Sequence, residues 1–84
     1  MNNDTAIMVM NIPKKNICVD LEIPLDISAN ELVFALNTAY ELGIEITNIK
    51  DCYLKSENPI ALLKGNKSLA EFGLRNGSII NYEE

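Results

Sequence analysis

The sequence contains no histidine, and its only cysteines, Cys18 and Cys52, are far apart and form no CxxC pair. Zinc sites are usually built from cysteine and histidine at short spacings, so we expect no metal site. The missing histidine is also the general base that most often activates a serine or cysteine nucleophile. The serines Ser28, Ser56 and Ser68 stand where helix caps and turns are expected. We therefore expect neither a cofactor nor enzymatic activity.

Basic residues are scarce as well. Seven lysine and arginine residues stand against twelve aspartate and glutamate residues, a net charge of −5. The lysines of Lys14-Lys15, like Lys64 and Lys67, fall in expected turns, where a solvated side chain is the simplest interpretation. Because affinity for nucleic acids rests on clustered lysine and arginine, we expect no nucleic-acid partner.

No hydrophobic run approaches the length of a membrane-spanning helix, so we expect no membrane insertion. The start, Met1-Asn2-Asn3-Asp4, is polar and acidic where a signal peptide would be basic, which favours a cytoplasmic location. The 84 residues, 48% of them hydrophobic, suit one domain with a modest core. We expect a single domain over residues 1–84, with residues 1–5 disordered or frayed.

The first apolar run, Ala6–Ile12, has the length of a strand. It is nearly continuous, so its pattern leaves two alternatives open: either Ile7 and Val9 or Met8 and Met10 face the core. If the methionines faced outward, they would add a flexible apolar surface suited to adaptable contacts.

A second strand follows a hairpin connection at Pro13-Lys14-Lys15-Asn16. Residues Ile17–Ile23 alternate, which predicts one buried and one solvated face. The buried face would carry Val19, Leu21 and Ile23, and the solvated face Cys18, Asp20 and Glu22. Since both cysteines fall in predicted strands, we expect each to be a buried free thiol.

The clearest helix signal begins at Ser28. Ser28-Ala29-Asn30-Glu31 is a capping box, in which serine and glutamate each satisfy the other's backbone amide. An amphipathic helix is predicted behind it, within Ser28–Leu42, with Gly43 as its C-terminal cap. Its apolar side would carry Leu32, Val33, Leu36, Ala39 and Tyr40.

The sequence from residue 51 onward predicts two more strands and a closing segment. Asp51–Ser56 would place Cys52 and Leu54 on one face and Tyr53 and Lys55 on the other, and Ile60–Leu63 would form a short fourth strand. A helical turn at residues 68–74, a tight Asn76-Gly77 turn and a last strand through Ile80 and Tyr82 complete the chain. The order β-β-α-β-β-turn-β indicates an α+β fold, a mixed sheet of four to five strands packed on one helix.

This order resembles the ubiquitin-like β-grasp fold, and the resemblance covers nearly the whole chain. The pattern Val19-x-Leu21-x-Ile23-Pro24-x-x-x-Ser28 is similar to the hairpin-to-helix step of ubiquitin. Residues 69–74, with Ile80 and Tyr82 following, are similar to its turn and last strand. These are mostly core positions, so they indicate fold rather than activity.

Among bacterial ubiquitin-like proteins, the chain resembles the YukD/EsaB family. The shared features are its length, the strand Val19-Asp20-Leu21-Glu22-Ile23 and the closing motif Gly73-Leu74-Arg75-Asn76-Gly77. Ser78 departs from the aspartate often found there, and the first hairpin, residues 8–13, matches only loosely. The resemblance implies a cytoplasmic accessory or regulatory protein of the type VII (ESX-like) secretion systems of Gram-positive bacteria. Its implied partners are membrane-embedded components of that machinery or their cytoplasmic domains.

The sequence ends in Asn81-Tyr82-Glu83-Glu84. Ubiquitin and its sulfur-carrier relatives end in a flexible Gly-Gly tail that enters an activating enzyme, and no Gly-Gly lies upstream here. We therefore expect a non-conjugated protein. The alternatives are a ubiquitin-like adaptor unrelated to secretion and a carrier activated at its C-terminus.

A binding surface is the remaining functional candidate. The face of the sheet away from the helix would carry Tyr53, Lys55 and Ile79, which we take as a candidate protein-binding surface, since aromatic and aliphatic anchors dominate interfaces. Scattered surface residues without a role are the simpler interpretation of each one by itself. Pairing of an edge strand with a partner strand is a further possibility.

Overall fold

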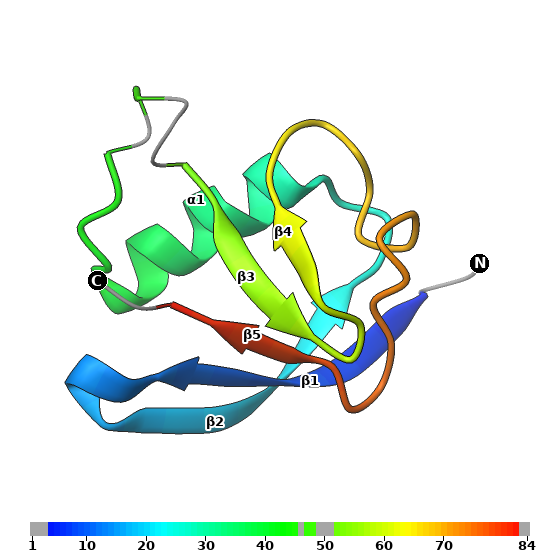
Figure 1. Ribbon diagram of the computed structural model, residues 1–84, viewed down its shortest axis with the longest axis horizontal. Coiled ribbons are helices and arrows are strands. Elements are labelled where there is room, and N and C mark those ends of the chain that lie inside the picture. Colours follow the sequence, from blue (N-terminus) through cyan, green and yellow to red (C-terminus); the bar gives the residue numbers. More distant parts are fainter. Residues whose placement is uncertain (1–3, 46, 49–51, 83–84) are drawn as a thin grey trace.

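The predicted strands and helix all form, with shifted bounds. The computed structural model describes residues 4–45, 47–48 and 52–82, which comprise five strands, one α-helix and one short 3₁₀ helix (Figure 1). Their bounds are β1 Thr5–Ile12, η1 Pro13–Lys15, β2 Ile17–Pro24, α1 Ala29–Tyr40, β3 Leu54–Glu57, β4 Ala61–Leu63 and β5 Ile79–Asn81.

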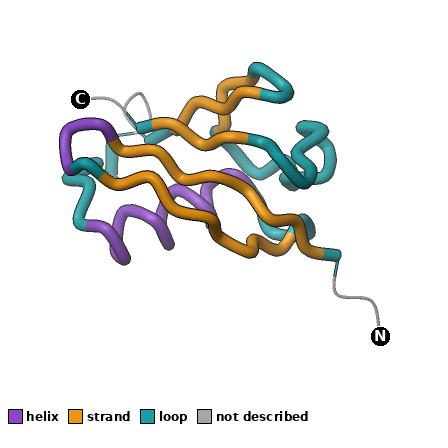
Figure 2. Tube along the Cα trace, turned by 90° about the horizontal axis from the view of Figure 1, so that it is seen from below, coloured by secondary structure: helices purple, strands orange, loops and turns teal. Residues whose placement is uncertain are grey.

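The strands form one sheet in the order β2-β1-β5-β3-β4. The central pair, β1 and β5, is parallel, and the β1–β2, β3–β5 and β3–β4 pairs are antiparallel. Helix α1 lies on one side of this sheet, as Figure 2 shows, and passes behind β3 and β4 in Figure 1. A mixed sheet packed on one helix is the α+β architecture predicted from the sequence. The parallel pair places the first and last strands side by side.

The two alternatives for the first strand are now decided. Met8 and Met10 are fully buried, whereas Ile7 is 47% exposed. The methionines therefore face the core, and the outward apolar surface of β1 is made by Ile7 and the half-buried Val9. The core between sheet and helix also contains Leu32, Val33, Leu36, Leu69 and Ile80.

The capping box of α1 is confirmed. The Glu31 amide donates to the Ser28 hydroxyl over 3.1 Å, and the Ser28 amide donates to the Glu31 carboxylate over 2.8 Å. The C-terminal end differs from the prediction, because Glu41 rather than Gly43 takes the left-handed cap conformation, with Gly43 at positive φ two residues later. Ala39 is exposed, since it lies at the margin of the buried stripe that continues to Tyr40.

The prediction of buried cysteines is wrong for Cys18, which is exposed, while Cys52 packs partly against the core. Cys18 lies on β2, an edge strand, on the face away from the helix. On the helix side of the same strand Ile23 is buried, but Val19 is 40% exposed. An edge strand has a neighbour on one side only, so its alternation does not guarantee a covered face.

The closing segment is held by bonds within itself and by bonds to two other parts of the chain. Ser68 and Glu71 exchange the same two bonds as the capping box, each over 3.2 Å. The amide of Leu69 donates to the carbonyl of Ile27. The amide of Ile7 donates to the Asn76 side chain over 2.7 Å, and these bonds together position β5 beside β1.

Other sequence predictions fall at the margins of the described residues. Residues 1–3 and 83–84 lie outside them, whereas Thr5 is the first residue of β1. Strand β3 begins at Leu54, and Asp51, the predicted start, also lies outside. Within the described ranges, no helix combines the length and apolar character needed to cross a bilayer.

Candidate protein-binding face

The sheet face opposite α1, called the open face below, is arranged in lateral rows by the strand register. Side chains of paired residues stand next to one another across a sheet. One row crosses four strands through Asp20, Val9, Ile79 and Glu57. The next row crosses all five strands through Cys18, Asn11, Asn81, Lys55 and Leu62.

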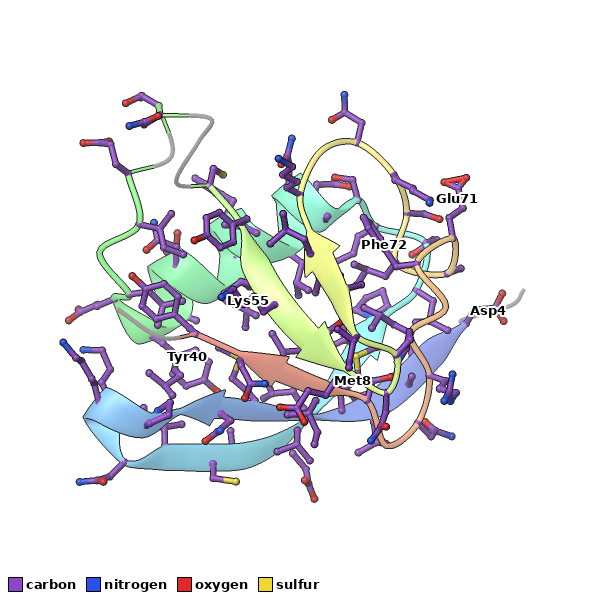
Figure 3. All side chains as sticks on the ribbon, viewed as in Figure 1. Asp4, Met8, Tyr40, Lys55, Glu71 and Phe72 are labelled. Atoms are coloured by element: carbon purple, nitrogen blue, oxygen red, sulfur yellow. The ribbon has the colours of Figure 1, made fainter. Side chains whose placement is uncertain are left out.

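The structure brings two of the three predicted site residues onto this face. Ile79 is half-buried on β5, paired with Val9 on one side and Glu57 on the other. Lys55 is exposed on β3, in the adjacent row beside Asn81 (Figure 3). Tyr53 is half-buried and precedes β3 by one residue, at the edge of the arrangement.

A chain of side-chain hydrogen bonds crosses the middle of the open face. Asn11 donates to the Asn81 carbonyl oxygen over 3.0 Å, and Asn81 donates to the Glu57 carboxylate over 2.7 Å. These bonds link β1, β5 and β3 and fix the position of the Glu57 side chain. The open face is therefore an ordered surface with an apolar part around Val9 and Ile79 and a polar part beside it.

A shallow hollow of about 490 Å³ adjoins this polar part at the β3–β4 hairpin. Ile60 is 89% exposed and Leu62 is 43% exposed at its border. Neither residue is among the site residues predicted from the sequence. Ile60 directly follows Asn58-Pro59, and an apolar residue at the tip of a hairpin is a signal that could have identified it.

A second shallow hollow, of about 480 Å³, lies on the outer side of α1 between Ile27 and Phe34. Phe34 is 55% exposed there.

No group of three or more histidine, cysteine, aspartate or glutamate side chains suited to a metal is found in residues 4–45, 47–48 and 52–82. The buried hydroxyl of Ser56 donates to the Pro59 carbonyl, and Ser78 bonds Arg75 and Asn58, so both serines hold turns.

Five strands in this order around one helix define the ubiquitin-like class of proteins, and solved structures agree. The C-terminal ubiquitin-like domain of mouse tubulin-specific chaperone e superposes with a TM-score of 0.71 at 8% identity, covering 100% of this chain and 92% of that one. A designed protein based on ubiquitin superposes with a TM-score of 0.63 at 11% identity, covering 94% and 87%. At these identities the likeness establishes the fold alone.

The family follows from the sequence itself. Residues 7–81 match the model of the family described as "WXG100 protein secretion system (Wss), protein YukD", so the chain belongs to the YukD family. This confirms the resemblance seen in the closing motif and the second strand. A search of curated proteins by sequence gave no match.

Proposed function

We propose that this chain is a non-enzymatic binding protein that acts in the cytoplasm as an accessory or regulatory component of a type VII secretion system. The supporting observation is the match of residues 7–81 to a family named for the WXG100 secretion system. The fold supports a binding role, because it presents an ordered, partly apolar face that no helix covers in the described residues.

The contacts of this component with its partners are made by the open face. Lys55 supplies an exposed charge, and Ile79 an apolar surface beside Val9. Tyr53, half-buried and one residue before β3, is the third proposed contact residue. The partners would be cytoplasmic domains of the secretion machinery, since a small domain without a membrane-spanning helix among its described residues reaches membrane components through their cytoplasmic parts.

Deletion of the gene in its host, followed by quantification of a WXG100-type substrate in the culture medium, tests the proposal. Secretion should fall on deletion and return with the wild-type chain. Complementation with Tyr53→Ala, Lys55→Ala and Ile79→Ala should restore less. Phe34→Ala and Lys64→Ala, which change an exposed apolar residue on α1 and an exposed basic residue after β4, should restore secretion fully. Unchanged secretion in the deletion strain would overturn the proposal.

A further inference from the structure

The apolar centre of the open face is framed by carboxylates on both sides. Asp20 on β2 pairs with Val9, and Glu57 on β3 pairs with Ile79, so one row reads acid, apolar, apolar, acid. In the row before it, Glu22 on β2 pairs with Ile7. An apolar strip along β1 and β5 thus lies between negative charges on the two neighbouring strands.

The spacing of the charges gives the width of what fits between them. Asp20 and Glu57 are three strand positions apart, β2 to β1 to β5 to β3. Neighbouring strands lie about 4.8 Å apart, so the backbones that carry the two carboxylates stand about 14 Å apart across the sheet. An α-helix with its side chains is about 10–12 Å wide. One helix therefore fits between the two acidic borders, with its axis along the strands.

The carboxylates are in place to receive positive charge. Glu22 accepts one bond from Thr5 over 2.8 Å, and Glu57 accepts one from Asn81 over 2.7 Å. A carboxylate has two oxygens and about four acceptor positions, so each keeps capacity for a lysine or arginine. Asp20 is exposed. Lys55, the basic residue on the five strands' open side, lies one row beyond Glu57, next to Asn81.

We infer that the open face binds an amphipathic helix of a partner protein, whose apolar stripe covers Ile7, Val9 and Ile79 and whose flanks carry lysine or arginine. Helix-in-groove recognition uses such a stripe at i, i+3, i+4 and i+7. The basic flanks meet Asp20 and Glu22 on one side and Glu57 on the other. Complementary rim charges set partner choice and association rate more than total affinity. This inference rests on the proposed function, because both assign binding to the open face.

The test uses the full chain, labelled with ¹⁵N, and three synthetic helical peptides of the same length. All carry one leucine stripe, and their flanks are lysine, glutamine or glutamate. Amide shifts on titration should centre on Ile7, Val9 and Ile79. The lysine peptide should bind about tenfold more tightly than the glutamate peptide, a ratio that three exposed charge pairs can supply. Raising the salt concentration should reduce that ratio.

Matched variants distinguish an effect of the carboxylates beside the apolar strip from an effect of the protein's net charge. Asp20→Asn with Glu57→Gln should weaken binding of the lysine peptide several-fold and leave the glutamine peptide unaffected. Glu41→Gln with Glu45→Gln removes two exposed charges after α1 and should change neither. Circular dichroism checks that each variant is folded.

Equal affinities for the lysine and glutamate peptides, absence of binding, or shifts centred on Phe34 would overturn the inference. So would an equal effect of the control pair. A failure here is distinguishable from failure of the proposed function, because the titration needs no secretion system. Binding of the lysine peptide together with normal secretion in the deletion strain would contradict the proposed function and leave this inference standing.

Discussion

The side-chain amide of Asn37 bonds both backbone polar groups of Ile44, seven residues further on. Its oxygen accepts from the Ile44 amide over 2.9 Å, and its nitrogen donates to the Ile44 carbonyl over 3.0 Å. This pair of bonds fastens the segment after α1 to the helix and holds the Ile44 side chain in the core.

We expect Asn37→Asp to lower the free energy of unfolding by about 1–3 kcal/mol, because the carboxylate keeps the acceptor but places negative charge against the Ile44 carbonyl. Urea unfolding monitored by circular dichroism measures the change. Thr38→Asp puts the same charge on the neighbouring exposed position and should cost less. Equal losses would show that the two bonds to Ile44 add nothing specific.

A second prediction concerns Ser78, which is fully buried. Its hydroxyl accepts from the Arg75 amide over 3.0 Å and donates to the Asn58 carbonyl, joining the turn before β5 to the β3–β4 turn. Ser78→Ala leaves both partners unsatisfied and should cost about 1–3 kcal/mol. Ser68→Ala, which removes a hydroxyl from a half-buried turn, should cost less in the same urea experiment. The reverse order would contradict the role given to Ser78.

The facing of β1 gives a third prediction. Met8 is fully buried and Ile7 is 47% exposed, although the two are neighbours of similar size. Met8→Ala should destabilise the fold by about 2–5 kcal/mol through a core cavity. Ile7→Ala should cost under about 1 kcal/mol, as expected away from the core. Thermal and urea unfolding of the pair would refute this facing if Ile7→Ala were the more damaging.

The two thiols should react at different rates. Cys18 is exposed on β2, whereas Cys52 is partly covered by the core. We expect an aromatic disulfide reagent to modify Cys18 first, because access of the reagent limits the reaction of a covered thiol. Cys52→Ser isolates the fast phase and Cys18→Ser the slow one. Faster modification of the Cys18→Ser variant would place Cys52 at the surface instead.

The sequence alone predicts the fold here because local signals agree with one another. The Ser28–Glu31 box starts the helix, alternation marks β2, and the turn at Gly77 leads into β5. The facing of β1 could not be predicted, because apolar residues occupy both sides of this strand. The structure shows why: Met8 belongs to the core, while Ile7 belongs to the open face.

The binding face was only partly predictable for a different reason. The rows that join Val9 to Ile79 depend on a parallel pairing between strands 70 residues apart in sequence, and local patterns carry no information on that register. The expectation that Cys18 is buried has another origin, the usual burial of free thiols, and it conflicts with the alternation of residues 17–23, which places Cys18 on the solvated face. Cys18 is exposed because it lies on the open face of β2, as the alternation indicates, at the edge of the sheet.

Photo-crosslinking in the living host tests most directly whether the open face contacts the secretion machinery. A photoreactive amino acid replaces Ile7 on the open face or, as the matched control, Phe34 on the outer side of α1, two apolar residues of comparable exposure at 47% and 55%. Irradiation should join the chain to a component of the type VII secretion system from position 7 and not from position 34. Adducts to that machinery from position 34 alone, or from neither position, would contradict the proposed role of this face.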